Sequence, residues 1–146
     1  MASLVDLAKD PTKRRAIVED AAALLNAEVA DKRGFSGKAV KLAFRAVKGV
    51  SPGMIPMSID ALLDDFCVQV QPFWESAQNS GQTTRVYFNA NSSAIANALL
   101  SITDGRAKRS HQRVLRSAYS KLRGQAVKHI SDSMTRLADL VERHAS

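Results

Sequence analysis

Apolar residues recur at intervals of three and four along most of the chain, and this period constrains the fold more than any other feature. In the first long stretch, Val18, Leu25 and Val29 are separated by seven and four residues. This spacing places side chains on one face of an α-helix. Asp10-Pro11 begins the stretch with an N-cap and a proline at the first helical position. The sequence therefore predicts an all-α protein.

Helix-breaking residues divide this pattern into segments. Gly34 follows the basic end of the first long helix as a C-cap, Ser36 can cap the next helix, and Ser51-Pro52-Gly53 ends that one. With 146 residues, the chain is long enough to build one hydrophobic core without disulfides. We expect a single compact domain over residues 1–146, a bundle of five to seven helices with a short N-terminal segment at 1–10. The predicted helices cover residues 11–33, 37–49, 55–71, 92–104, 106–123 and 125–144.

Three segments are less regular. Pro72 is expected to end or kink the helix before it, which leaves Phe73-Trp74 as a short aromatic segment. Residues 84–88 are strand-like, but a lone strand has no partner, so we interpret them as a helical turn or an ordered loop. The last predicted helix carries an apolar seam with heptad-like spacing. The seam residues are Val127, Ile130, Met134, Leu137 and Val141.

The charges are unevenly distributed along the chain. It has 21 Lys and Arg against 14 Asp and Glu, a formal net charge of +7. Two segments without any acidic residue, 32–48 and 105–131, hold 14 of the 21 cations. The rest of the chain therefore has a net charge of −7, so the basic character belongs to these two segments alone.

Within each basic segment, four cations are spaced by three, four and three residues and form a stripe about 15 Å long on one helix face. Like charges at this spacing oppose helix formation by roughly a few tenths of a kcal/mol per pair. Unmixed stripes therefore suggest an anionic partner. The candidate anion-binding residues are Arg106, Arg109, Arg113 and Arg116, with Lys38, Lys41, Arg45 and Lys48 in a secondary role.

The alternative is that the stripes are solvated basic faces, or that acidic residues neutralise them inside the fold. Asp60, Asp64 and Asp65 are candidates for such neutralisation, as are Glu19 and Asp20. Which of these holds depends on how the helices pack.

No catalytic, cofactor or metal motif is recognisable. Residues 34–38, Gly-Phe-Ser-Gly-Lys, resemble a fragment of a phosphate loop or nucleophile elbow, but they follow a helix. We interpret them as a helix end and an N-cap whose N–H groups can contact an anion. His111, His129 and His144 lack the spacing of metal ligands, and Cys67 is expected to be a buried, inert thiol. We therefore expect neither a metal nor a cofactor, and no enzymatic activity.

The N-terminus lacks the basic start and apolar run of a signal peptide, which predicts a cytoplasmic protein. The longest uncharged stretch, 86–103, contains several Asn and Ser residues and is too polar to cross a bilayer.

Several segments resemble a family of small bacterial helical domains with no assigned activity. They are residues 4–7, 28–41, 52–56, 62–66 and 100–104. The resemblance implies one compact cytoplasmic domain over nearly the whole chain and transfers no site residues.

Three functions remain open. The first is a non-enzymatic binding module whose basic stripes contact nucleic acid or another polyanion. The second is a scaffold for oligomerisation or protein interaction, which would use the seam of the last helix and Phe73-Trp74. The third is a carrier that holds an apolar small molecule between helices.

Overall fold

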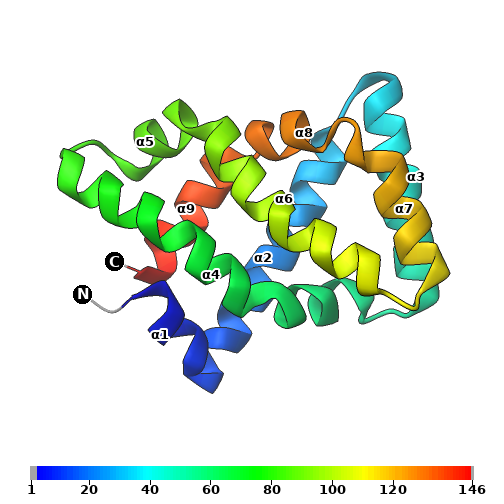
Figure 1. Cartoon of the computed structure of the whole chain (residues 1–146), viewed down its shortest axis with the longest axis horizontal. Coiled ribbons are helices and arrows are strands. Elements are labelled where there is room, and N and C mark those ends of the chain that lie inside the picture. Colours follow the sequence, from blue (N-terminus) through cyan, green and yellow to red (C-terminus); the bar gives the residue numbers. More distant parts are fainter. Residues whose placement is uncertain (1–2, 146) are drawn as a thin grey trace.

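The computed structural model describes residues 3–145, and within that range the chain is all-α, as predicted. The nine helices there exceed the expected five to seven (Figure 1). In chain order they are α1 (Leu4–Lys9), α2 (Pro11–Asp31), α3 (Gly34–Val50), α4 (Met54–Ser80), α5 (Thr84–Ala90), α6 (Ser92–Arg109), α7 (Arg113–Arg123), α8 (Ala126–Asp132) and α9 (Met134–Ala145).

Pro72 does not end a helix, because α4 continues through it to Ser80. A proline inside a helix removes a hydrogen bond and crowds the preceding turn. Burial beyond the proline opposes that cost, since Trp74 is 2% exposed and Ala77 is fully buried. Phe73 also packs against the core, so the expected aromatic contact surface of a scaffold lies inside the molecule.

The strand-like residues 84–88 are helical, as part of α5, and Thr83 caps that helix by accepting a hydrogen bond from the backbone N–H of Val86. The last predicted helix is instead two helices, because the chain turns at Ser133 between α8 and α9. Met134 and Val141 of the expected seam are core residues. The seam is therefore neither continuous nor exposed.

One hydrophobic core holds most of the molecule together, and six helices supply its buried residues. They are Leu4, Leu7, Ala8, Ile17, Val18, Ile59, Leu63, Cys67, Val70, Trp74, Phe88, Ile95, Met134, Ala138, Val141 and Ala145. These residues lie on α1, α2, α4, α5, α6 and α9. Burial of this apolar surface is the main force that stabilises the fold.

Helices α3 and α7 contribute no residue to that core. They lie side by side at the end of the molecule opposite α1 (Figure 1). We call this pair the α3–α7 lobe. Its buried residues are Gly37, Val40 and Ala43 of α3 and Ala118 of α7. All four are small or medium-sized, so the two helices can approach closely.

The α2–α3 corner requires glycine at two positions. Gly34 has φ of 74°, in the left-handed region that disfavours side chains. At Gly37, a Cβ atom would lie 2.8 Å from the carbonyl carbon of Lys32. The Gly-Phe-Ser-Gly segment therefore positions the start of α3 against the end of α2.

Candidate anion-binding site

The structure divides the eight predicted anion-binding residues among three helices. Lys38, Lys41, Arg45 and Lys48 lie along α3, as expected. The four arginines do not share a helix, which corrects the predicted stripe: Arg106 and Arg109 end α6, whereas Arg113 and Arg116 begin α7. Residues 110–112 separate the two helices without a glycine or proline, so no breaker signal marked this boundary. All eight side chains are exposed except Lys41, which is half-buried.

Two hollows flank the contact between α3 and α7. On the outer side of the lobe, a groove of about 460 Å³ runs between the two helices. On the inner side, where the lobe meets α4 and α6, a cleft of about 480 Å³ opens. Ala43 and Ala118 line both hollows, which places these two alanines at the contact between the helices.

The basic residues lie on the edges of the lobe that point away from this contact. At 100° per residue, all four α3 cations lie about 140–160° from Ala43 around the helix axis. Arg113 and Arg116 lie about 140–160° from Ala118 in the same way. The α3 cations and the pair Arg113 and Arg116 therefore lie on the outer flanks of the two helices, and Arg113 also lines the groove between them.

The outer groove has an apolar floor and a basic rim. Arg113 and Lys121 line it from α7, and Leu42 and Val114 lie in its walls. Leu42 is 62% exposed, and nearby Phe35 is 92% exposed at the start of α3. The ammonium group of Lys38 lies 5.9 Å from the Phe35 ring, within range of a cation–π contact. Lys121 was not among the predicted site residues, because it lies outside the three-four-three spacing.

Three of the acidic residues that were expected to neutralise the stripes form ion pairs with cations outside the stripes. Asp60 and Asp64 contact the Arg14 guanidinium at 2.7 and 2.8 Å. Asp20 contacts Arg143 and His144. Neither α3 nor α7 contains an acidic residue. Internal neutralisation by Asp60, Asp64 or Asp20 therefore does not occur.

Two cations of the basic segments do have carboxylate partners. Lys32, between α2 and α3, lies 3.4 Å from Glu28. Arg123, at the end of α7, donates two hydrogen bonds of 2.8 and 3.1 Å to Asp104 of α6. This pairing, followed by a hydrogen bond from Tyr119, lowers the pKa of Asp104. Neither cation is one of the eight candidates, so these pairs leave the stripes unneutralised.

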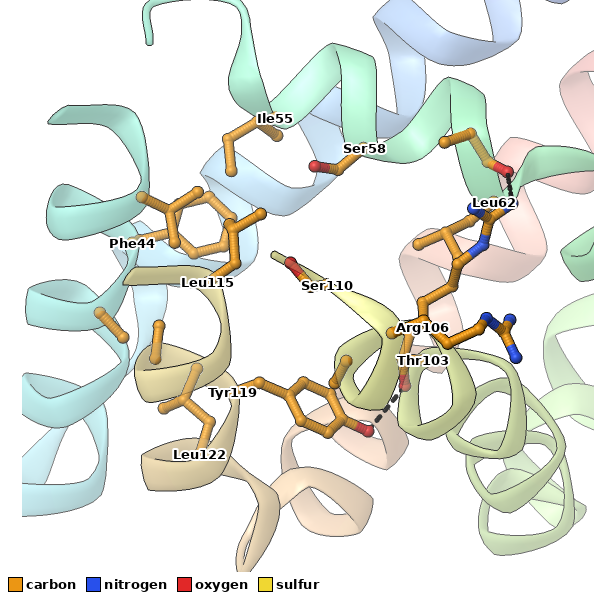
Figure 2. Close-up of a pocket in the computed structure, with 16 residues that line it drawn as sticks. Phe44, Ile55, Ser58, Leu62, Thr103, Arg106, Ser110, Leu115, Tyr119 and Leu122 are labelled. Atoms are coloured by element: carbon orange, nitrogen blue, oxygen red, sulfur yellow. Dashed lines mark hydrogen bonds between the residues drawn. The ribbon is translucent and has the colours of Figure 1, made fainter. Parts of the chain in front are cut away.

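The inner cleft is asymmetric in its chemistry (Figure 2). Phe44, Leu115 and Leu122 form an apolar side, whereas Arg106 and Thr103 lie on the opposite side with α6. The Tyr119 hydroxyl donates to the Asp104 carboxylate and lies 2.9 Å from the Thr103 hydroxyl. Burial, and then the hydrogen bond to Asp104, raises the pKa of Tyr119. Sequence reasoning missed this cleft because four helices supply its lining.

Ser36 and His129 form a contact that the sequence did not indicate, since 93 positions separate them. Ser36 Oγ lies 2.6 Å from His129 Nε2 and links the start of α3 to α8. Burial, and then the nearby charge of Lys32, lowers the pKa of His129. A serine–histidine pair is thus present that no motif in the sequence indicated. However, His129 Nδ1 is buried without a partner, so the third group that orients the base in a hydrolytic triad is missing from residues 3–145.

The described residues contain no cluster of three or more metal-ligating side chains. Cys67 is a buried free thiol in the core, as predicted. Within the same range, no helix is both long enough and apolar enough to span a membrane.

Comparison with known proteins supports the family assignment alone. Neither curated proteins nor solved structures include a significant match to the chain. A family profile, in contrast, matches almost its full length, residues 4–145. The chain therefore belongs to that family, a family of unknown function called DUF6918.

Proposed function

We propose that the protein is a non-enzymatic binding module that contacts an extended polyanion through the outer side of the α3–α7 lobe. The observation that carries this proposal is the placement of two acid-free basic helices side by side, outside the hydrophobic core. Arg113 and Lys121 line the outer groove, and Lys38 and Arg45 are exposed on α3, the helix that forms its other wall.

The concentration of like charge has a cost that folding alone does not explain. Repulsion within each stripe disfavours the helices, and mixed-sign pairs would stabilise them instead. Elsewhere cations do pair with carboxylates, between helices, as Arg85 with Asp139 and Arg136 with Glu28 and Asp31. A binding role for the lobe accounts for the difference, because a polyanion would neutralise the charges that the fold leaves unpaired.

Single-stranded nucleic acid is the polyanion that fits the outer side best. Bases stack on exposed aromatic rings while cations contact the phosphates. Phe35 is 92% exposed and lies beside Lys38, which supplies both elements at one position. We place the module in the cytoplasm, a reducing compartment in which a free thiol such as Cys67 persists.

The test is binding of a fluorescent single-stranded oligonucleotide over a range of salt concentrations. Four phosphate contacts predict a slope of about −3 in log K against log salt. Two double charge-reversal variants should each abolish measurable binding while the helical circular dichroism signal is unchanged. One combines Lys38→Glu with Arg45→Glu, and the other combines Arg113→Glu with Lys121→Glu.

The matched control reverses Lys9 and Lys13, two exposed cations far from the lobe. It changes net charge by the same amount and should reduce binding only slightly. The proposal would be contradicted by an oligonucleotide affinity that does not depend on salt. It would also be contradicted if the control and the lobe variants lost equal oligonucleotide affinity. Binding to vesicles of anionic lipid without binding to the oligonucleotide would assign the surface to a membrane instead.

A further inference from the structure

We propose that the inner cleft binds a single-chain amphiphile with an anionic head group, of which a free fatty acid is the simplest example. This inference goes beyond the proposed polyanion contact and uses a different surface. It rests on the way the cleft combines an apolar side with an uncompensated pair of arginines.

The apolar side of the cleft suits a hydrocarbon chain. Phe44 and Val47 of α3, Ile55 of α4, and Leu115 and Leu122 of α7 line it. Figure 2 shows Phe44, Leu115 and Leu122 gathered away from Arg106. The volume of about 480 Å³ lies within the range of small-molecule sites in proteins. A bound chain would cover apolar surface that the lobe and the core leave open between them.

The polar side supplies a recognition group for an anion. Arg106 and Arg109 both line the cleft at the end of α6. Arg106 donates one hydrogen bond, from Nη2 to the carbonyl oxygen of Ala61 at 2.9 Å. Arg109 has no ion pair or hydrogen bond among residues 3–145, and its guanidinium lies beside Gly105.

The acidic residue nearest to these arginines in the sequence, Asp104, already has other partners. Asp104 accepts hydrogen bonds from Arg123 and Tyr119. Arg106 and Arg109 thus bring positive charge to the edge of the cleft, and their planar N–H pairs match a carboxylate or sulfate head group. A neutral apolar ligand would leave this charge unpaired, so the observations favour an amphiphile over the purely apolar ligand expected from sequence.

The test is a titration of the full chain with decanoate in an isothermal titration calorimeter. Comparison ligands are 1-decanol and acetate. Decanoate should bind saturably with one site per chain. It should bind about tenfold more tightly than 1-decanol, because only the carboxylate forms charge-assisted hydrogen bonds. Acetate, which lacks the chain, should not bind measurably.

Three variants separate the contributions of chain and head group. Ala107→Phe fills the cleft from α6 and should abolish decanoate binding, and Ser58→Leu, which fills it from α4, provides a second test if the first variant folds poorly. Arg109→Gln should weaken decanoate about tenfold, to the affinity of 1-decanol, and leave 1-decanol binding unchanged. Val68→Phe, on an exposed side of α4, and Arg15→Gln are the matched controls and should bind as the wild type does.

The proposal is overturned if the wild-type chain binds no decanoate, or if decanoate binds equally well to folded Ala107→Phe and Ser58→Leu variants. Equal affinity of decanoate and 1-decanol would reject the head-group assignment. The two proposals fail independently: the Lys38→Glu/Arg45→Glu variant should bind decanoate normally, and the Ala107→Phe variant should bind the oligonucleotide normally.

Discussion

At the scale of single residues, the thiol of Cys67 lies on the buried side of α4 and is 9% exposed. Burial, and then the negative charge of Asp64, raises its pKa to about 11. Because the thiolate is the reactive form, the folded protein at about pH 8 should react with a disulfide reagent about 100-fold more slowly than a free thiol does. The measurement compares reagent consumption by native and denatured protein. Equal rates in the two states would show that α4 opens readily or that the thiol is accessible.

His129 makes the stability of the fold depend on pH. Its pKa is lowered in the folded state by burial and by Lys32, so the unfolded chain binds more protons at mildly acidic pH. This contribution to stability is fully present above the unfolded pKa of about 6.5 and is lost as the pH falls toward the folded pKa. Unfolding by urea should therefore show a loss of stability from about pH 7.5 to about pH 5.5 that is smaller in His129→Gln.

The charged groups that act on His129 are Lys32, Lys128 and Asp132. His111 is exposed, so His111→Gln provides the control and should keep the pH dependence of the wild type. If His129→Gln and the wild type lost equal stability, the titrating group would lie elsewhere.

At the scale of one element, α3 contains two glycines whose replacement should have opposite effects. Gly37→Ala would bring a Cβ to 2.8 Å from backbone of Lys32 and should destabilise the protein by about 1–3 kcal/mol, the usual cost of overpacking. Gly49→Ala meets no atom within 4 Å and should stabilise it by about 0.4–1 kcal/mol, because alanine restricts the unfolded chain. Urea unfolding of both variants tests the pair. A neutral Gly37→Ala would mean that α2 and α3 are not in close contact.

The elements also show which parts of the fold the sequence could predict. Apolar spacing predicted helices wherever the core faces one side, as in α2. The prediction that a helix ends at Pro72 failed, because burial of Trp74 overrides this local helix breaker. Apolar spacing also failed at residues 110–112, where packing of α7 on α3 ends α6 without any glycine or proline. Local signals thus predict helices well and predict breaks imposed by tertiary packing poorly.

At the scale of the whole molecule, the candidate site also has one part that the sequence could predict and another part that depends on tertiary packing. The two basic segments could be read from charge and spacing alone, because a stripe depends only on helical geometry. The placement of the α3 cations beside Arg113 and Arg116 of α7 depends on the contact of Ala43 with Ala118, 75 positions apart in the chain. The inner cleft depends on four helices at once. Long-range packing of this kind leaves no local pattern in a single sequence.

The molecule also divides into a core and a less stable lobe. Stability within a protein varies locally, and regions with few buried apolar contacts open most readily. Helices α3 and α7 give no residue to the core and carry unneutralised like charges, and the inner cleft opens where they meet α4 and α6. Amide hydrogen exchange should therefore be faster in α3 and α7 than in α4 and α9. Added salt should slow exchange in the lobe selectively, because screening weakens the repulsion there.

Ligands distinguish the two proposed surfaces in the same measurement. An oligonucleotide on the outer side should protect α3 and α7 alone, since it contacts only those helices. Decanoate in the cleft should protect α3 and α7 together with the facing turns of α4 and α6, because it would join the lobe to the core. Uniform protection of all helices in the free protein, unaffected by salt, would contradict this division, since it would mean that the lobe unfolds only with the core.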